Sequence, residues 1–65
     1  MVIYMELPKD PYILLSYINT KLRNDFHTLE DLCNSLRLNK EQLTSSLSDI
    51  GYRYSPQQNQ FVSAE

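Results

Sequence analysis

The sequence predicts a mainly α-helical domain with a small β-hairpin, in which three helices form a helix-turn-helix or winged-helix-like arrangement. Apolar residues recur at spacings of three and four over residues 10–24, 28–36 and 39–50, which is the period of an amphipathic helix. After Gly51 the period falls to two over residues 52–62, which is the period of a strand. Because the chain has only 65 residues, these elements belong to one domain that spans it.

Residues 10–24 form the first predicted helix. Asp10 is a suitable N-cap, because its carboxylate can accept hydrogen bonds from the unpaired N–H groups of the first turn. Pro11 suits the first helical position, where an N–H group would have no partner. The side that faces the core is formed by four apolar residues: Leu14, Leu15, Ile18 and Leu22.

A second strip of the same helix lies beside the core stripe. Ile13 and Tyr17 are four residues apart, and Lys21 follows one turn later. Either the N-terminal segment or a partner covers this strip. With the polar end of the helix it makes a candidate interaction surface: Ile13, Tyr17, Asn19, Lys21 and Arg23. The alternative is a solvated helix end, where the basic side chains complement the helix dipole.

Residues 28–36 and 39–50 form a pair of helices joined by a tight turn. Thr28 and Asn39 are their predicted N-caps. Each helix turns an apolar stripe toward a shared core: Leu29, Leu32, Cys33 and Leu36 in the first, and Leu43, Leu47 and Ile50 in the second. Arg37 stands in the turn at a position where glycine is common, so a left-handed Arg37 would carry strain.

Residues 52–62 form the predicted hairpin, directly after the third helix, where a winged helix carries its wing. Tyr52 and Tyr54 lie on one face of its first strand, and Asn59 in the turn tolerates φ > 0. We expect these tyrosines and Phe61 to anchor the hairpin to the core rather than to stack on a ligand, because a two-stranded hairpin needs packing to be stable.

Residues 1–7 are apolar and rich in β-forming residues, and Pro8 follows them. This composition predicts a short strand or an extended arm. Such a strand packs on the domain or pairs with the C-terminal hairpin. The alternative is an edge strand that serves self-association.

Charge and reactive side chains exclude several classes of function. Six basic and eight acidic residues give a net charge of −2, so there is no general attraction to nucleic acid or to an anionic membrane. The single cysteine and the single histidine have no evident partner for catalysis or metal binding, so we expect no enzyme, no cofactor and no metal. One cysteine, no signal peptide and no run of about 20 apolar residues predict a cytoplasmic protein without a membrane segment.

Six short motifs stand out along the chain: Asp10-Pro11, Leu14 to Ser16, Ile18 to Arg23, Leu29 to Cys33, Ile50 to Tyr52 and Asn59 to Phe61. They resemble a family of small bacterial stand-alone proteins described as domain of unknown function 4250. The likeness covers the chain from about Pro8 to Val62, and the run from Asn19 to Arg23 is its most specific part. It implies a bacterial cytoplasmic origin and an N-terminal extension at residues 1–5. It brings no activity, cofactor or binding residue.

Two functions follow from these patterns. The first is a non-catalytic module for protein interaction or self-association, whose partner is another protein or a second copy of the chain. The alternative is a DNA-binding winged helix of the transcription-regulator type. Its candidate nucleic-acid face is Arg37, Lys40, Gln42, Thr44, Ser45, Ser48 and Arg53. Glu41 and Asp49 lie on the same face and oppose contacts with phosphate, which makes DNA the weaker candidate.

Overall fold

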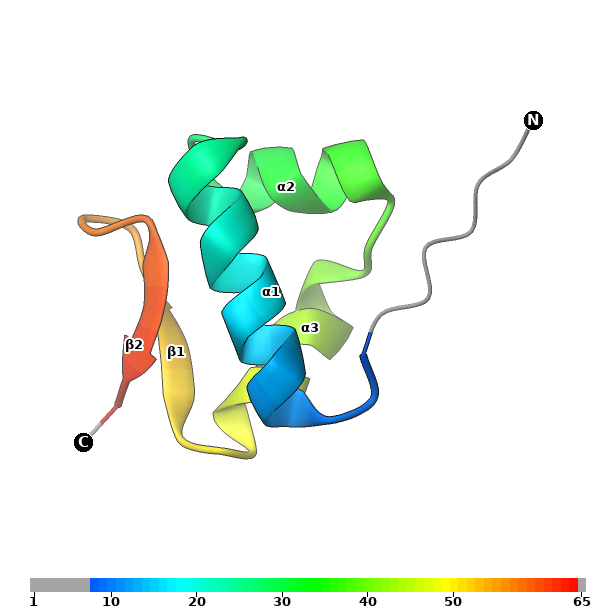
Figure 1. The fold of residues 1–65 in the computed structure, drawn as a ribbon, viewed down its shortest axis with the longest axis vertical. Helices are drawn as coiled ribbons and strands as arrows, with labels where there is room; N and C mark the ends of the chain where they lie inside the picture. The colour runs from blue at the N-terminus through cyan, green and yellow to red at the C-terminus, as the bar shows by residue number, and fades with distance from the viewer. Residues whose placement is uncertain (1–7, 65) are drawn as a thin grey trace.

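The computed structural model describes residues 8–64, which fold into three helices followed by a two-stranded antiparallel sheet (Figure 1). The elements are α1 (Pro11–Asn24), α2 (Leu29–Leu36), α3 (Lys40–Ser48), β1 (Tyr52–Ser55) and β2 (Gln60–Ser63). The predicted fold class, mainly helical with a small hairpin, is confirmed. The strand or arm predicted at residues 1–7 lies outside the described residues.

Each helix begins where a polar side chain accepts a hydrogen bond from the first helical turn. The accepting side chains and their shortest distances to a backbone nitrogen are Asp10 (2.8 Å), Thr28 (3.0 Å) and Asn39 (3.1 Å). These N–H groups have no partner within the helix, so a side chain that pairs with them fixes where the helix starts. All three predicted N-caps are therefore confirmed.

Tight turns end α2 and α3. Arg37, which follows α2, adopts φ 55° and ψ 45°, the left-handed conformation that glycine takes more easily than arginine. The helix α3 ends at Ser48, two residues before the predicted end. The reason is that the N–H groups of Ile50 and Gly51 bond to carbonyls three residues back, which narrows the last turn. Gly51 then takes φ 82°, a conformation that glycine adopts at little cost.

The core lies where the three helices and the hairpin meet. Nine apolar side chains are buried in it: Leu14, Ile18, Leu22, Leu29, Leu32, Cys33, Leu43, Leu47 and Phe61. The other predicted core positions are half-buried and pack against these: Leu15, Leu36, Ile50, Tyr52 and Tyr54. The rings of Tyr54 and Phe61 lie 5.7 Å apart between centroids. The hairpin is thus anchored to the core by its aromatic residues, as predicted.

Two asparagine side chains also join the hairpin to α1. Nδ2 of Asn19 donates to the carbonyl of Phe61 at 3.0 Å, and its Oδ1 accepts from the N–H of Phe61 at 2.7 Å. Nδ2 of Asn59 donates to the carbonyls of Leu22 and Phe26, at 3.0 and 2.9 Å. These carbonyls lie where α1 ends, and helix ends leave acceptors without a partner. The hairpin is therefore held to α1 by hydrogen bonds as well as by apolar contact.

Candidate interaction surfaces

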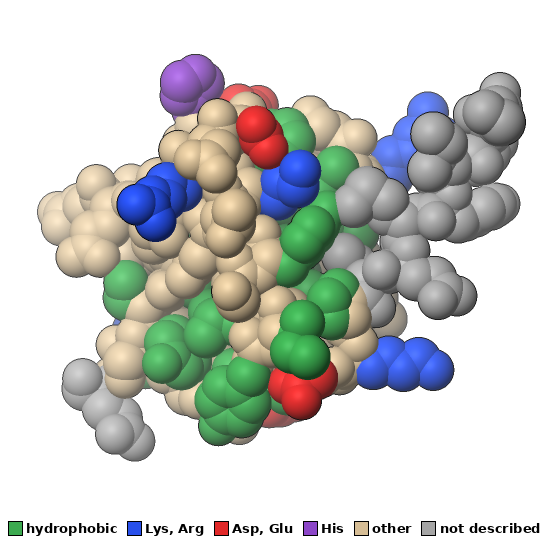
Figure 2. Space-filling model, viewed as in Figure 1, with side chains coloured by type: hydrophobic (Ala, Val, Ile, Leu, Met, Phe, Trp, Pro, Cys, Tyr) green, Lys and Arg blue, Asp and Glu red, His purple; other side chains and the backbone are tan. Residues whose placement is uncertain are grey.

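Two large apolar side chains are exposed at the start of α1. Tyr12 is 62% exposed and Ile13 is 58% exposed, and no other large hydrophobic residue among residues 8–64 is as open to solvent. The face of the molecule in Figure 2 shows hydrophobic side chains gathered on both sides of the lower half of α1. A small domain has few apolar residues for its core, so leaving two adjacent ones in water suggests that something else covers them.

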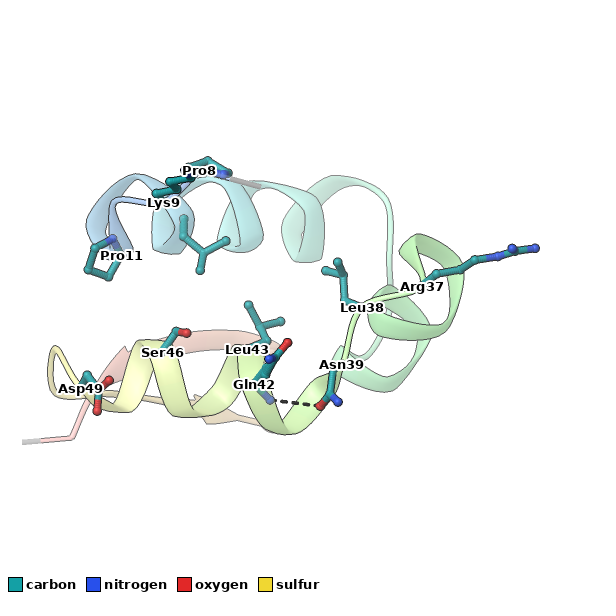
Figure 3. A pocket seen from close by; sticks show the side chains of 11 residues that line it. Pro8, Lys9, Pro11, Arg37, Leu38, Asn39, Gln42, Leu43, Ser46 and Asp49 are labelled. Carbon is teal, nitrogen blue, oxygen red and sulfur yellow. Dashed lines mark hydrogen bonds between the residues drawn. The ribbon is translucent and has the colours of Figure 1, made fainter. Parts of the chain in front are cut away.

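A groove runs between α1 and the α2–α3 turn with α3 (Figure 3), and Pro11 and Leu14 line it from α1. Its apolar lining comes from Pro8, Pro11, Leu14, Leu38 and Leu43. In Figure 3 the side chains of Leu38 and Leu43 project from the turn and from α3 toward α1. The polar lining consists of Lys9, Arg37, Asn39, Gln42, Ser46 and Asp49. An apolar floor with charges of both signs at its edge suits a peptide segment better than a phosphate or a nucleic acid.

The predicted interaction residues of α1 divide between two sides of the helix. Tyr17 and Lys21 lie on the side of Ile13, with Nζ of Lys21 5.8 Å from the centre of the Tyr17 ring and 3.3 Å from Oδ2 of Asp25. Asn19 and Arg23 lie on the side of α1 that faces the hairpin, where they line a pocket together with Tyr12, Tyr52 and Gln60. The predicted set therefore does not form one continuous surface.

Sequence reasoning placed Ile13 in a candidate surface and missed Tyr12 and the groove. Tyr12 precedes Ile13 and is outside the core stripe, so helical spacing alone could have drawn attention to it. The groove had no such signal, because Leu38 and Leu43 belong to a different helix pair from α1 and meet it only in the folded chain.

The predicted nucleic-acid face is polar and mostly exposed. Six of its residues are exposed: Arg37, Lys40, Gln42, Ser45, Ser48 and Arg53. Thr44 is half-buried, and its hydroxyl donates to the carbonyls of Lys40 and Glu41 at 2.9 and 3.1 Å. In Figure 3 the side chain of Arg37 points away from the groove into solvent. Glu41 in the first turn of α3 and Asp49 at its C-cap are both exposed and acidic, so no uniformly basic surface forms there.

The single cysteine and the single histidine differ in burial. Cys33 is buried in the core, and burial raises the pKa of its thiol, while the nearby charge of Lys40 lowers it to a lesser extent. The thiol therefore stays protonated at neutral pH. His27 is exposed in the connector between α1 and α2. Within residues 8–64 no three or more His, Cys, Asp or Glu side chains lie together in a way that could hold a metal ion. No helix among these residues is long and apolar enough to cross a membrane.

The model of the family described as Domain of unknown function (DUF4250) matches residues 8–61. No curated protein and no solved structure matches the chain.

Proposed function

The chain belongs to the DUF4250 family, and we propose that it is a non-catalytic module that binds another protein or a second copy of itself through the start of α1. The observation that carries this proposal is the exposure of Tyr12 and Ile13, two adjacent apolar side chains at the start of α1. Covering two such side chains would remove apolar surface from water, and this is the main favourable term in protein association.

The groove indicates what kind of segment would bind. Its apolar floor would take the hydrophobic side chains of a short helix or extended segment. Lys9 and Asp49 at its edge would favour a segment that carries charges of both signs beside the apolar residues.

The placement of reactive groups supports a role without catalysis. The Cys33 thiol is buried and protonated, and His27 lies in an exposed connector. A nucleophile and its base need to be within hydrogen-bonding distance, and this pair supplies neither an activated thiol nor a positioned base. A single free thiol also suits a reducing compartment, and we place the protein in the cytoplasm on that ground.

Site-specific photocrosslinking tests the proposal. A photoreactive phenylalanine analogue replaces Tyr12 in the cells that make the protein, and crosslinked products are identified by mass spectrometry. The matched control carries the same analogue at Asn24, which is exposed at the other end of α1. We expect a discrete product, a dimer or one partner protein, from position 12 and none from position 24.

The substitution Ile13→Glu, made together with the crosslinker at position 12, should abolish that product, because it places a charge in the buried centre of the contact. Products of equal yield from both positions, or none from position 12, would contradict the proposal.

DNA binding remains the second candidate, because α3 follows a tight turn and exposes Gln42, Ser45 and Ser48, where base-reading residues of a helix-turn-helix would lie. The hairpin follows α3 directly, as a wing would. The charge of α3 opposes this function: one basic residue, Lys40, stands against Glu41 and the capping Asp49. Phosphate contacts supply nearly all non-specific affinity for DNA, so we rank this candidate below protein binding.

A further inference from the structure

The two edges of the hairpin differ in whether their backbone groups are paired. Ala64 N–H donates to the carbonyl of Gly51 at 2.8 Å, so residue 51 faces β2. Along an antiparallel strand, the backbone groups of successive residues point alternately toward and away from the paired strand. Arg53 and Ser55 therefore also point their backbone groups at β2. Tyr52 and Tyr54 alternate with these residues, so their backbone N–H and C=O groups point away from β2, at the free edge of β1.

The same alternation turns the backbone of Phe61 outward from β2, since it is paired in register with Tyr54. The side chain of Asn19 pairs with both backbone groups of Phe61: its Nδ2 donates to the carbonyl, and its Oδ1 accepts from the N–H. A side-chain amide thus occupies the position that a neighbouring strand would take. The edge of β2 is closed at this point.

The edge of β1 has no such cover. The outward N–H and C=O groups of Tyr52 and Tyr54 make no hydrogen bond to any other part of residues 8–64. Because buried backbone groups are nearly always paired, groups without a partner in the described chain are expected to face water. An exposed strand edge of this kind is a template for a further strand.

We propose that residues 2–6 of a second copy of the chain bind along this edge as a third strand. These residues are β-forming, and their single charge is Glu6, which would lie on the same face as the exposed Arg53. In that arrangement Ile3 and Met5 would lie on the opposite face from Glu6, which is the face of the sheet that carries Tyr52 and Tyr54.

Pairing of β1 with β1 of another copy is less favourable. The register that would satisfy all four outward groups of both strands places Tyr52 opposite Tyr54 and therefore Arg53 opposite Arg53. Like charges directly opposite each other in a sheet are destabilising. Arg53 therefore discourages the symmetric pair and favours a strand that carries an acidic residue.

The geometry also favours a second copy over the chain's own N-terminal residues. In the view of Figure 1, the hairpin and the described segment that leads into α1 (blue) lie on opposite sides of α1. The N-terminal residues of the same chain would therefore have to pass around α1 to pair with β1. This contact uses none of the residues proposed above to bind at the start of α1, so the two proposals stand or fall separately.

Amide hydrogen exchange followed by NMR, with the mass in solution from sedimentation equilibrium, tests the inference. The first variant lacks residues 2–6, so that Met1 precedes Leu7. In it, the amide hydrogen of Tyr54 should exchange roughly tenfold faster than that of Arg53, which β2 protects. In the full chain, raising the concentration should slow exchange at Tyr52 and Tyr54 as dimer forms, and leave Arg53 unchanged.

Charge variants of the full chain supply the matched control. Glu6→Lys and Arg53→Glu should each raise the dimer dissociation constant roughly three- to tenfold, since each replaces an attraction with a repulsion. The double variant should restore the dimer. A full chain that is monomeric at millimolar concentration, or a dimer that survives the deletion of residues 2–6, would overturn the inference. In the second case the Ile13→Glu variant would show whether the start of α1 forms that dimer.

Discussion

The side chain of Asn59 makes three hydrogen bonds from a backbone position with φ 51°. Its amide nitrogen donates to two carbonyls at the end of α1, and its oxygen accepts from the hydroxyl of Tyr54 at 2.6 Å. That hydroxyl oxygen in turn accepts from the N–H of Leu29, the first residue of α2, at 3.2 Å. One residue of the hairpin turn thereby connects the turn to the ends of two helices.

We expect Asn59→Ala to lower the free energy of unfolding by about 4–5 kcal/mol. Roughly 1 kcal/mol is lost for each of three hydrogen bonds, and a further 1–2 kcal/mol arises because alanine resists the left-handed conformation. Asn59→Gly is the matched control, since it removes the same hydrogen bonds but adopts the left-handed backbone conformation without strain. Urea unfolding should find the glycine variant more stable than the alanine variant by about 1 kcal/mol. Equal stabilities would mean that the backbone conformation carries no cost.

A side-chain hydrogen bond can be predicted from the sequence only when the two partners are close together along the chain. The N-caps Asp10, Thr28 and Asn39 were predictable because the N–H groups they bind lie two or three residues away. Asn19 and its partner Phe61 are separated by 42 residues, and no local pattern connects them. Asn19 was singled out as a candidate interaction residue, whereas the structure pairs its amide within the domain. Asn59 was expected only to tolerate φ > 0, which it does.

Among the elements, the α2–α3 turn fixes how the two helices cross. Arg37 holds the left-handed conformation there, and its side chain is exposed. The following residue, Leu38, donates its N–H to the carbonyl of Cys33 at 2.8 Å, which closes the end of α2. The turn geometry is thus set by backbone hydrogen bonds, and Arg37 adopts a conformation that its side chain disfavours.

Arg37→Gly should therefore stabilise the protein by up to about 1 kcal/mol. The gain of about 1–2 kcal/mol from removing the Cβ strain is partly offset by roughly 0.5–1 kcal/mol, because glycine makes the unfolded chain more flexible. Arg37→Ala keeps the strain and loses the same charge, so its urea midpoint should stay near that of the unsubstituted protein. A glycine variant no more stable than the alanine variant would show that the turn is unstrained.

The elements also show where local patterns stop being informative. The hydrophobic period and the caps located all three helices and the hairpin, because both signals are repeated within each element. The end of α3 was placed two residues too late, since Ile50 continues the apolar stripe although its N–H bonds three residues back. An apolar stripe records which side chains are buried, and it does not record where helical hydrogen bonding ends.

For the whole molecule, the fold was more predictable than the surfaces. The core stripes need only be apolar at the right spacing, and they met as expected in one interior. The groove depends on how α1 lies against α3 and the turn, which no spacing in the sequence specifies. The candidate surface on α1 was likewise divided between two sides of the helix, because its residues were grouped by position along the chain.

The net charge of −2 leads to an expectation for DNA that concerns the whole surface. In a gel-shift assay at low salt, we expect no retention of genomic fragments at tens of micromolar protein, where basic DNA-binding domains bind non-specifically. The double variant Glu41→Lys, Asp49→Lys is the control, and it should gain retention that falls steeply as salt is added. Specific retention of a fragment by the unsubstituted protein would reverse our ranking of the two candidate functions.

The bond between Asn19 and β2 also bears on the solubility of the protein. The strand that it covers carries Phe61 and Val62, and an uncovered edge next to such residues is where chains begin to stack into fibrils. The side-chain amide of Asn19 occupies the two backbone groups of Phe61 that such stacking would use. Loss of this amide would then show itself first as clouding of a concentrated solution, before any large fall in melting temperature.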